Sequence, residues 1–140
     1  MLEFDPSLEL QAAIRSRLLA SPGLLTLVPA DNIGDQSGRP EKVPSIIIGE
    51  AQVVYRRFAA EVHTTIHVWQ QEPGLVWAKA ATGHIVRALQ QDAQMDGPFS
   101  TEHFAVLDMR ASDSRFMRDP HGSYSHTVIN VTATVKELAA

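Results

Sequence analysis

The chain has 140 residues, 44% of them hydrophobic and 20% charged, a composition that fits one globular domain and excludes a disordered chain. The absence of cysteine excludes a disulfide framework, a thiolate nucleophile and a cysteine-ligated zinc site. The formal charge of −4 disfavours a primary nucleic-acid binder, and no apolar run is long enough to predict a membrane span. We expect a single domain over residues 1–140 and no secretory signal in its opening residues.

The first 28 residues predict two helices. Asp5 and Pro6 suit the N-cap and the first helical position of a helix that should end near Ala20. The apolar positions of this helix recur every four residues, at Leu10, Ile14 and Leu18. Residues 21–28 again begin with Ser and Pro and predict a short second helical turn.

Strands are expected in the middle of the chain. Residues 29–45 are rich in Gly and Pro and predict a long, mobile loop. The apolar residues 45–50 then predict a strand, which residues 52–57 continue past a bend at Gly49. Residues 61–70 alternate, which is typical of a strand with one buried face. One face carries Val62, Thr64, Ile66 and Val68, and the other carries His63, Thr65, His67 and Trp69.

The second half of the chain predicts a helix followed by two long strands. From Leu75 to Leu89 the apolar residues follow a helical period, and a break is expected at residues 96–98. Residues 103–119 predict a strand with a polar or bulged middle, and residues 123–137 predict a closing strand. The order indicates an α+β fold, an antiparallel β-sheet with helices packed on one face.

The stretch RDPHGSYSH, residues 118–126, holds the densest group of side chains capable of acid, base or nucleophile chemistry. Ser123 or Ser125 with His121 or His126 and an Asp would supply the residue types of a Ser–His–Asp set, but no GxSxG motif is present. Pro and Gly within the stretch are equally typical of a turn. We therefore predict a hairpin tip between the last two strands.

Two histidines four residues apart, His63 and His67, raise the question of a metal site. Four strand residues span about 13 Å, whereas two ligands of one zinc ion lie within roughly 4 Å of each other. The pair therefore cannot hold one metal alone, and we expect no metal and no cofactor. Trp69 and Trp77 flank the corner between the strand and the helix, where they either mark an interface or, as we favour, pack on each other.

Three stretches of the chain resemble the tail-completion, or tail terminator, proteins of long-tailed (siphovirus-like) phages and gene transfer agents. They are PSIIIGEAQVV, HTTIHVWQQEPGLVWAKAATGHIVRALQ and VLDMRASDSRFMRDPHGSYSHTVINVTATV. The likeness is greatest where IHVWQ runs into an Ala-rich helix and where RDPHG precedes a closing strand. With the opening IRSRLLASPGLLTLV, it extends over residues 8–136.

The resemblance implies a tail terminator-like fold and a structural virion protein, not an enzyme. It implies a ring, usually a hexamer, that caps the tail tube, ends tail polymerisation and joins the tail to the head connector or stopper protein. Genomic DNA would pass through the lumen without tight binding, and no membrane would take part. The protein would be assembled in the host cytoplasm and would lie at the head-proximal end of the virion tail.

Polar loops are the expected contact surfaces for neighbouring subunits or partners. Their candidate residues are Arg56, Arg57, Arg115, Arg118, Asp119 and His121. Two alternatives stay open on the residues alone. One is a small α+β enzyme that uses the 118–126 hairpin, and the other is a small-molecule or nucleic-acid binding module.

Overall fold

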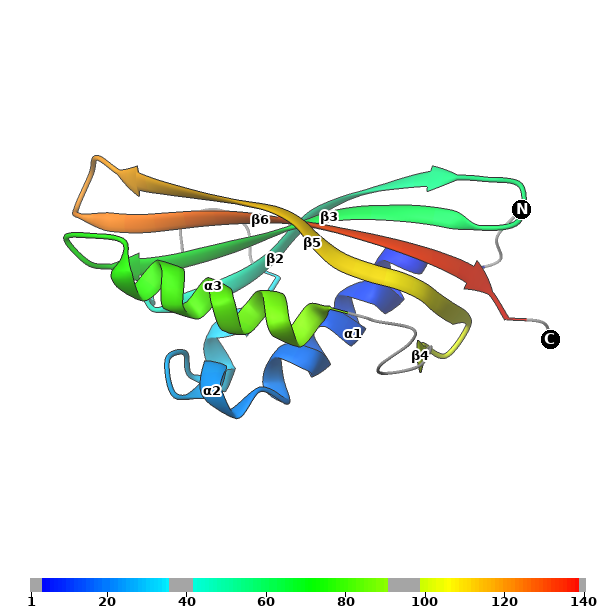
Figure 1. Ribbon diagram of the computed structural model, residues 1–140, viewed down its shortest axis with the longest axis horizontal. Coiled ribbons are helices and arrows are strands. Elements are labelled where there is room, and N and C mark those ends of the chain that lie inside the picture. The colour runs from blue at the N-terminus through cyan, green and yellow to red at the C-terminus, as the bar shows by residue number, and fades with distance from the viewer. Residues whose placement is uncertain (1–3, 36–41, 91–98, 139–140) are drawn as a thin grey trace.

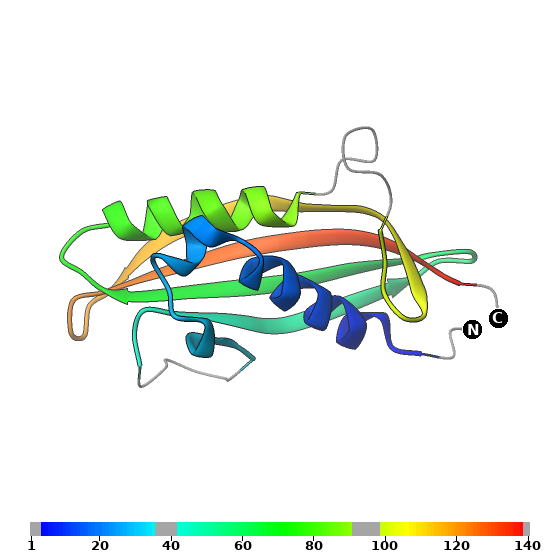
Figure 2. The ribbon, with the colours of Figure 1, turned by 90° about the horizontal axis from the view of Figure 1, so that it is seen from below.

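One twisted β-sheet runs along the molecule, and α-helices lie on one of its faces (Figure 1, Figure 2). The computed structural model describes residues 4–35, 42–90 and 99–138. Within them the strands lie in the order β1-β2-β3-β6-β5-β4. The helical elements are α1 Pro6–Leu19, α2 Pro22–Leu25, the 3-10 turn η1 Ala30–Asn32 and α3 Val76–Leu89. The strands are β1 Ile33–Gly34, β2 Ser45–Tyr55, β3 Ala60–Gln71, β4 Phe99–Ser100, β5 Phe104–Asp119 and β6 Tyr124–Glu137. The predicted α+β class is confirmed.

The two N-terminal helices begin at the caps that the sequence predicts. The Asp5 carboxylate accepts a hydrogen bond from the Ser7 amide at 2.9 Å, so α1 starts with a satisfied backbone donor. The Ser21 hydroxyl accepts from the Leu24 amide at 3.3 Å and begins α2 in the same way. The predicted stripe of α1 is buried against the sheet: Leu10, Ile14 and Leu18.

Helix α3 lies beside α1 over the centre of the sheet (Figure 2). It begins one residue after the predicted Leu75 and ends at the predicted Leu89. Two of its buried residues are Ala78 and Ala81, whose small side chains let the helix backbone lie close to the strands below it. Ile85 and Leu89 complete the buried stripe of this helix.

The centre of the sheet is the antiparallel pair β3–β6. Its register runs without interruption from Ala60 opposite Val135 to Gln71 opposite Tyr124. Alternate residues of both strands point into the core, where Ile66 lies opposite Ile129 and both are fully buried. The alternation predicted for residues 61–70 and 123–137 is confirmed, except that Trp69 on the outward face is also buried.

Both strands that flank the central pair are irregular. β2 shifts its register between Ile48 and Ala51, at the bend predicted at Gly49. β5 shifts twice, between Val106 and Asp108 and between Ala111 and Asp113, which confirms the predicted bulged middle.

Two short strands were not predicted. Residues 29–45 were predicted as a loop, but they contain the turn η1 and β1, and β1 pairs with β2 in parallel. The sheet is therefore mixed at this edge. A strand of two residues carries no periodic pattern, which is why β1 and β4 were missed. The rest of the predicted loop at 36–41 and the predicted break at 96–98 lie outside the described residues.

The sheet face away from the helices is polar. We call it the open face; on the two central strands it includes His63, Thr65, His67, Trp69, His126, Asn130 and Thr132. Across the described part of the chain, the helices are too short or too polar for any of them to cross a membrane.

The central pair makes Ile66→Ala a test of the core. We expect this substitution to lower the free energy of unfolding by about 3 kcal/mol, because it leaves a cavity under the helices. Val76→Ala is the control; Val76 is 83% exposed, and its change should stay within about 0.5 kcal/mol. Denaturant unfolding measures the free energy of unfolding of both variants. An equal loss of this free energy in the two would contradict the assigned core.

Candidate functional site

The polar stretch 118–126 forms the tip of the β5–β6 hairpin, as predicted. β5 ends at Asp119 and β6 begins at Tyr124. The Asp119 carboxylate accepts a hydrogen bond from the His121 amide at 2.9 Å. Gly122 has φ 93° and Ser123 has φ 58°, and a Cβ at Gly122 would lie 2.6 Å from the Tyr124 ring. Glycine is therefore required at this turn.

Two contacts tie this tip to the loop that precedes α3. The Arg118 guanidinium donates a hydrogen bond to the Pro73 carbonyl oxygen. The Glu72 amide donates to the Ser123 carbonyl oxygen at 3.0 Å. The tip is thus held against the end of β3 and the start of α3 (Figure 1).

Glu72 is the residue that holds α3 to the sheet. Its carboxylate accepts hydrogen bonds from the amides of Trp77 and Ala78, both at 3.1 Å, and so caps the helix N-terminus. The same carboxylate accepts a hydrogen bond from the Ser125 hydroxyl at 2.8 Å. Sequence analysis missed this role, because a glutamate four positions before a helix does not match the usual start signal, an N-cap residue directly before the first helical position.

One candidate catalytic pair, Ser125 with His126, is not assembled. Ser125 is buried on the helix side, where it is bonded to Glu72, whereas His126 lies on the open face. The hydrogen-bond partner of His126 Nε2 is Nδ1 of His67, at 2.9 Å, and not a serine hydroxyl. His103 contacts Glu9 instead. It lies near the opposite end of β6, where the Leu138 amide donates a hydrogen bond to the His103 carbonyl oxygen. The side chains of Arg118, Asp119, Ser125 and His126 are thus engaged in structural contacts.

The histidines of β3 contact β6, not each other. His63 Nδ1 lies 3.4 Å from the Thr132 hydroxyl, and His67 is paired with His126. Among the residues that the structure describes, no group of three or more His, Cys, Asp or Glu side chains could hold a metal ion. The expected contact between Trp69 and Trp77 is wrong: Trp69 stacks on His126 on the open face, while Trp77 packs against the core on the helix side.

A second hairpin tip joins β2 to β3 and carries the other predicted contact residues. Arg56 forms an ion pair with Glu61 at 2.8 Å, and the Arg57 guanidinium lies 5.3 Å from the centroid of the Phe58 ring. Tyr55 and Phe58 are 67% and 76% exposed. We call residues 55–58 the aromatic tip.

The six candidate contact residues do not form one cluster. Arg56 and Arg57 lie at the aromatic tip, near the end of β6 where Val135 pairs with Ala60. Arg118, Asp119 and His121 lie at the β5–β6 tip, at the opposite end of the sheet (Figure 1). Arg115 lies between them along β5, opposite Val128. Five of the six candidates therefore lie at two separate ends of the sheet, and Arg115 lies between them.

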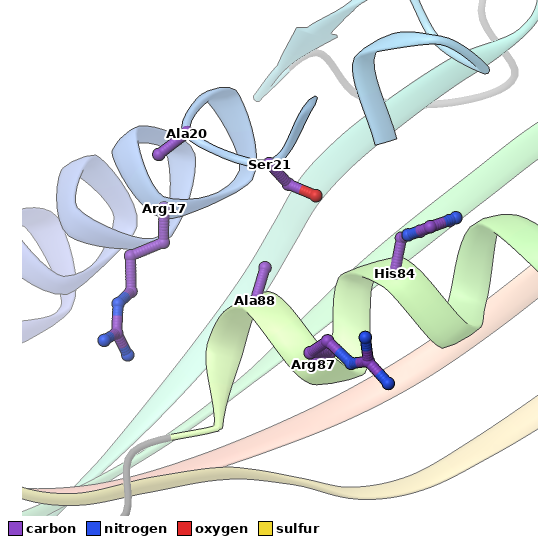
Figure 3. A pocket seen from close by; sticks show the side chains of 6 residues that line it. All are labelled: Arg17, Ala20, Ser21, His84, Arg87 and Ala88. Carbon is purple, nitrogen blue, oxygen red and sulfur yellow. The ribbon is translucent and has the colours of Figure 1, made fainter. Parts of the chain in front are cut away.

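A basic hollow lies on the helix layer between α1 and α3 (Figure 3). Its volume is about 290 Å³, and its lining includes Arg17, His84 and Arg87. Gly23 packs so closely against the His84 ring that a Cβ added at Gly23 would lie 2.5 Å from a ring atom. Sequence analysis did not single out this group, since its residues come from helices that are far apart in the chain.

A carboxylate–histidine pair ties α1 to the start of β5. The Glu9 carboxylate is 2.7 Å from Nδ1 of His103 and accepts hydrogen bonds at 2.8 Å from both the His103 amide and the Thr101 hydroxyl. Burial raises the pKa of Glu9, but these hydrogen bonds and the His103 charge outweigh it and bring the pKa below its ordinary value.

The fold places the chain among proteins built like a virion component. A chain in the solved structure described as the virion of a native gene transfer agent (GTA) particle has the same fold, with a TM-score of 0.79. The two are 19% identical, and the match covers 96% of this chain and 99% of that one. No curated protein matches this sequence.

The family model described as tail completion protein gp17 matches residues 12–136. The chain belongs to this family, and it is a structural protein of phage-type virion tails. The resemblance seen in the sequence is confirmed.

The cap on α3 makes Glu72→Ala a test of the helix anchor. We expect it to lower the free energy of unfolding by about 1–3 kcal/mol, because two helix amides and the Ser125 hydroxyl lose their acceptor. Hydrogen exchange at the amides of Trp77 and Ala78 should become faster. Glu102→Ala, at a solvent-exposed carboxylate, is the control. Unchanged exchange in the Glu72 variant would contradict the cap.

The Glu9 pair predicts an acid dependence of stability. Because the folded pKa of Glu9 lies below its ordinary 4.5, its contribution is present above pH 4.5 and is lost as the pH falls through the folded pKa. Glu9→Gln should lower the free energy of unfolding at neutral pH. It should also make the decrease of that free energy with falling pH smaller in this acid range. Denaturant unfolding at a series of pH values measures this effect, with Asp31→Asn, at an exposed carboxylate away from the pair, as the control. An unchanged pH dependence of stability in Glu9→Gln would rule out the pair.

Proposed function

We propose that this tail protein forms a ring, most simply a hexamer, that caps the head-proximal end of the tail tube. The ring would end tail polymerisation and provide the surface on which the head connector or stopper protein docks. The observation that carries the proposal is the family match, which extends over residues 12–136 and so includes nearly every described element. Assembly would take place in the host cytoplasm.

Two distant contact surfaces support a ring. In a cyclic assembly each subunit offers one surface to the neighbour on one side and a different surface to the neighbour on the other. The candidate residues lie at opposite ends of the sheet, which suits such a head-to-tail contact (Figure 1). A two-fold dimer would instead use the same surface twice.

The aromatic tip has the composition of an interface centre. Exposed Tyr55 and Phe58 stand beside Arg57, and aromatic residues and arginine are enriched among the residues that dominate binding energy. Arg56 is already held by Glu61, so the tip is ordered before it binds. We therefore assign the tip to a subunit or partner contact.

The net charge supports passage of DNA without tight binding. Each chain carries a formal charge of −4, so a ring of identical chains is negative overall and repels phosphate. A catalytic role is not part of the proposal; Arg118, Asp119 and Ser125 are engaged in turn and capping contacts. The proposal likewise includes no cofactor and no membrane contact.

Electron microscopy of the purified protein, alone and with tail tubes, tests the ring. We expect rings at high concentration and a cap at one end of each tube. Light scattering across a concentration series gives the assembly state. A stable dimer that neither forms rings nor binds tubes would overturn the proposal.

A charge reversal tests the aromatic tip separately. Arg57→Glu should raise the concentration needed for assembly by about tenfold or more, as expected for loss of a central interface contact. Monomer stability should be unchanged, because Arg57 is exposed. Lys79→Glu makes the same charge change on α3 and is the matched control. Equal assembly of both variants would remove the tip from the interface.

A further inference from the structure

Two histidines on the open face share a ring-to-ring hydrogen bond. Nδ1 of His67 on β3 and Nε2 of His126 on β6 are 2.9 Å apart, and the ring centroids are 5.1 Å apart. A hydrogen bond between two imidazole nitrogens needs one protonated and one unprotonated nitrogen. The pair therefore holds one proton in the shared position, and a second proton there would leave two donors facing each other.

Groups around the pair fix both rings in place. His126 lies flat on Trp69, with centroids 3.9 Å apart and planes 9° apart. The other ring nitrogen of His67, Nε2, is 3.6 Å from the Glu50 carboxylate of β2. Trp69 is only 8% exposed, so the stack covers a large aromatic surface on an otherwise polar face.

We propose that His67, His126 and Trp69 form a proton-sensitive latch on the open face. Near neutral pH the shared hydrogen bond holds His126 on Trp69. The first proton that the neutral pair takes up goes to a ring nitrogen outside that bond and leaves the bond intact, because an imidazolium can donate to a neutral imidazole. Once both rings are imidazolium, two donors face each other: the bond breaks, His126 leaves the stack, the open face gains positive charge and Trp69 is exposed. This inference concerns the single chain and holds whether or not the chain forms a ring.

The charged groups around the latch act in opposite directions. Glu50 from β2 faces His67, and Asp119, at the end of β5, favours the charged form of His126. Arg115 lies on β5 opposite Val128, the residue of β6 that pairs with His67. Burial of the imidazole and positive charge on His67 bring the pKa of His126 below its ordinary value, so the neutral form is favoured at pH 7. The remaining neighbour on β5 is Met117, opposite His126, which is uncharged.

Tryptophan fluorescence can report this latch directly. The chain has two tryptophans, so Trp77→Phe leaves Trp69 as the only one. As the pH falls from about 8 to 5, the range in which histidine titrates, the emission of Trp69 should move to longer wavelength. The transition should be lost in Trp77→Phe/His126→Gln.

The variant Trp77→Phe/His67→Gln tests the coupling between the rings. Removing the positive charge of His67 should move the transition to higher pH, because that charge opposes protonation of His126. His63→Gln lies on the same strand and face but contacts Thr132, so it should leave the transition unchanged. A merely structural role for His67 would lower stability without moving the midpoint.

Nuclear magnetic resonance of the unaltered chain gives a second readout that does not depend on Trp77→Phe folding. The imidazole resonances of His126 and the indole resonance of Trp69 should change together in one transition. A Trp69 signal that is independent of pH would overturn the latch. The latch would also be overturned if the Trp69 signal of the His126→Gln variant changed with pH as it does in the unaltered chain, whether that change came from a local shift or from loss of the fold.

Discussion

The uninterrupted pairing of β3 with β6 is the constraint on which the rest of the structure depends. It fixes which residues of the two strands face the helices and which face outward, because side chains alternate along a strand. A slip of one residue would place His67 and His126 in the core and Ile66 and Ile129 in water. The burial of these isoleucines under α1 and α3 therefore selects the register, and the register in turn positions every contact on the open face.

Two consecutive residues of β6 show how one register serves both sides. Ser125 points to the helix side and donates its hydroxyl proton to Glu72, which caps α3. His126 points to the open face and meets His67 and Trp69. The helix layer and the open face are thus fixed by neighbouring side chains, although they lie on opposite sides of the sheet.

The long elements could be predicted from the sequence because each buries a full periodic stripe. Helix α3 and strands β3 and β6 follow this rule, and their limits were found within a few residues. The two-residue strands were missed because pairing with a longer neighbour, not periodicity, creates them. The turn at 118–126 was recognised from Pro and Gly, but the partners of its residues were not. Glu72 meets Ser125, and Trp69 and His67 meet His126, on a strand that is distant in sequence, and no local pattern encodes such a pairing.

The bulges of β2 and β5 have a consequence for how the protein avoids unwanted association. Within the described residues, the outer edge of β2 is paired only at Ile46 and Ile47, and that of β5 only at Ala105 and Val106. The remaining lengths are exposed strand edges, on which a flat strand from another chain could add without limit. Each edge is interrupted by a register shift, and β5 also carries alternating Asp and Arg side chains. These features make open-ended sheet growth between free subunits unfavourable.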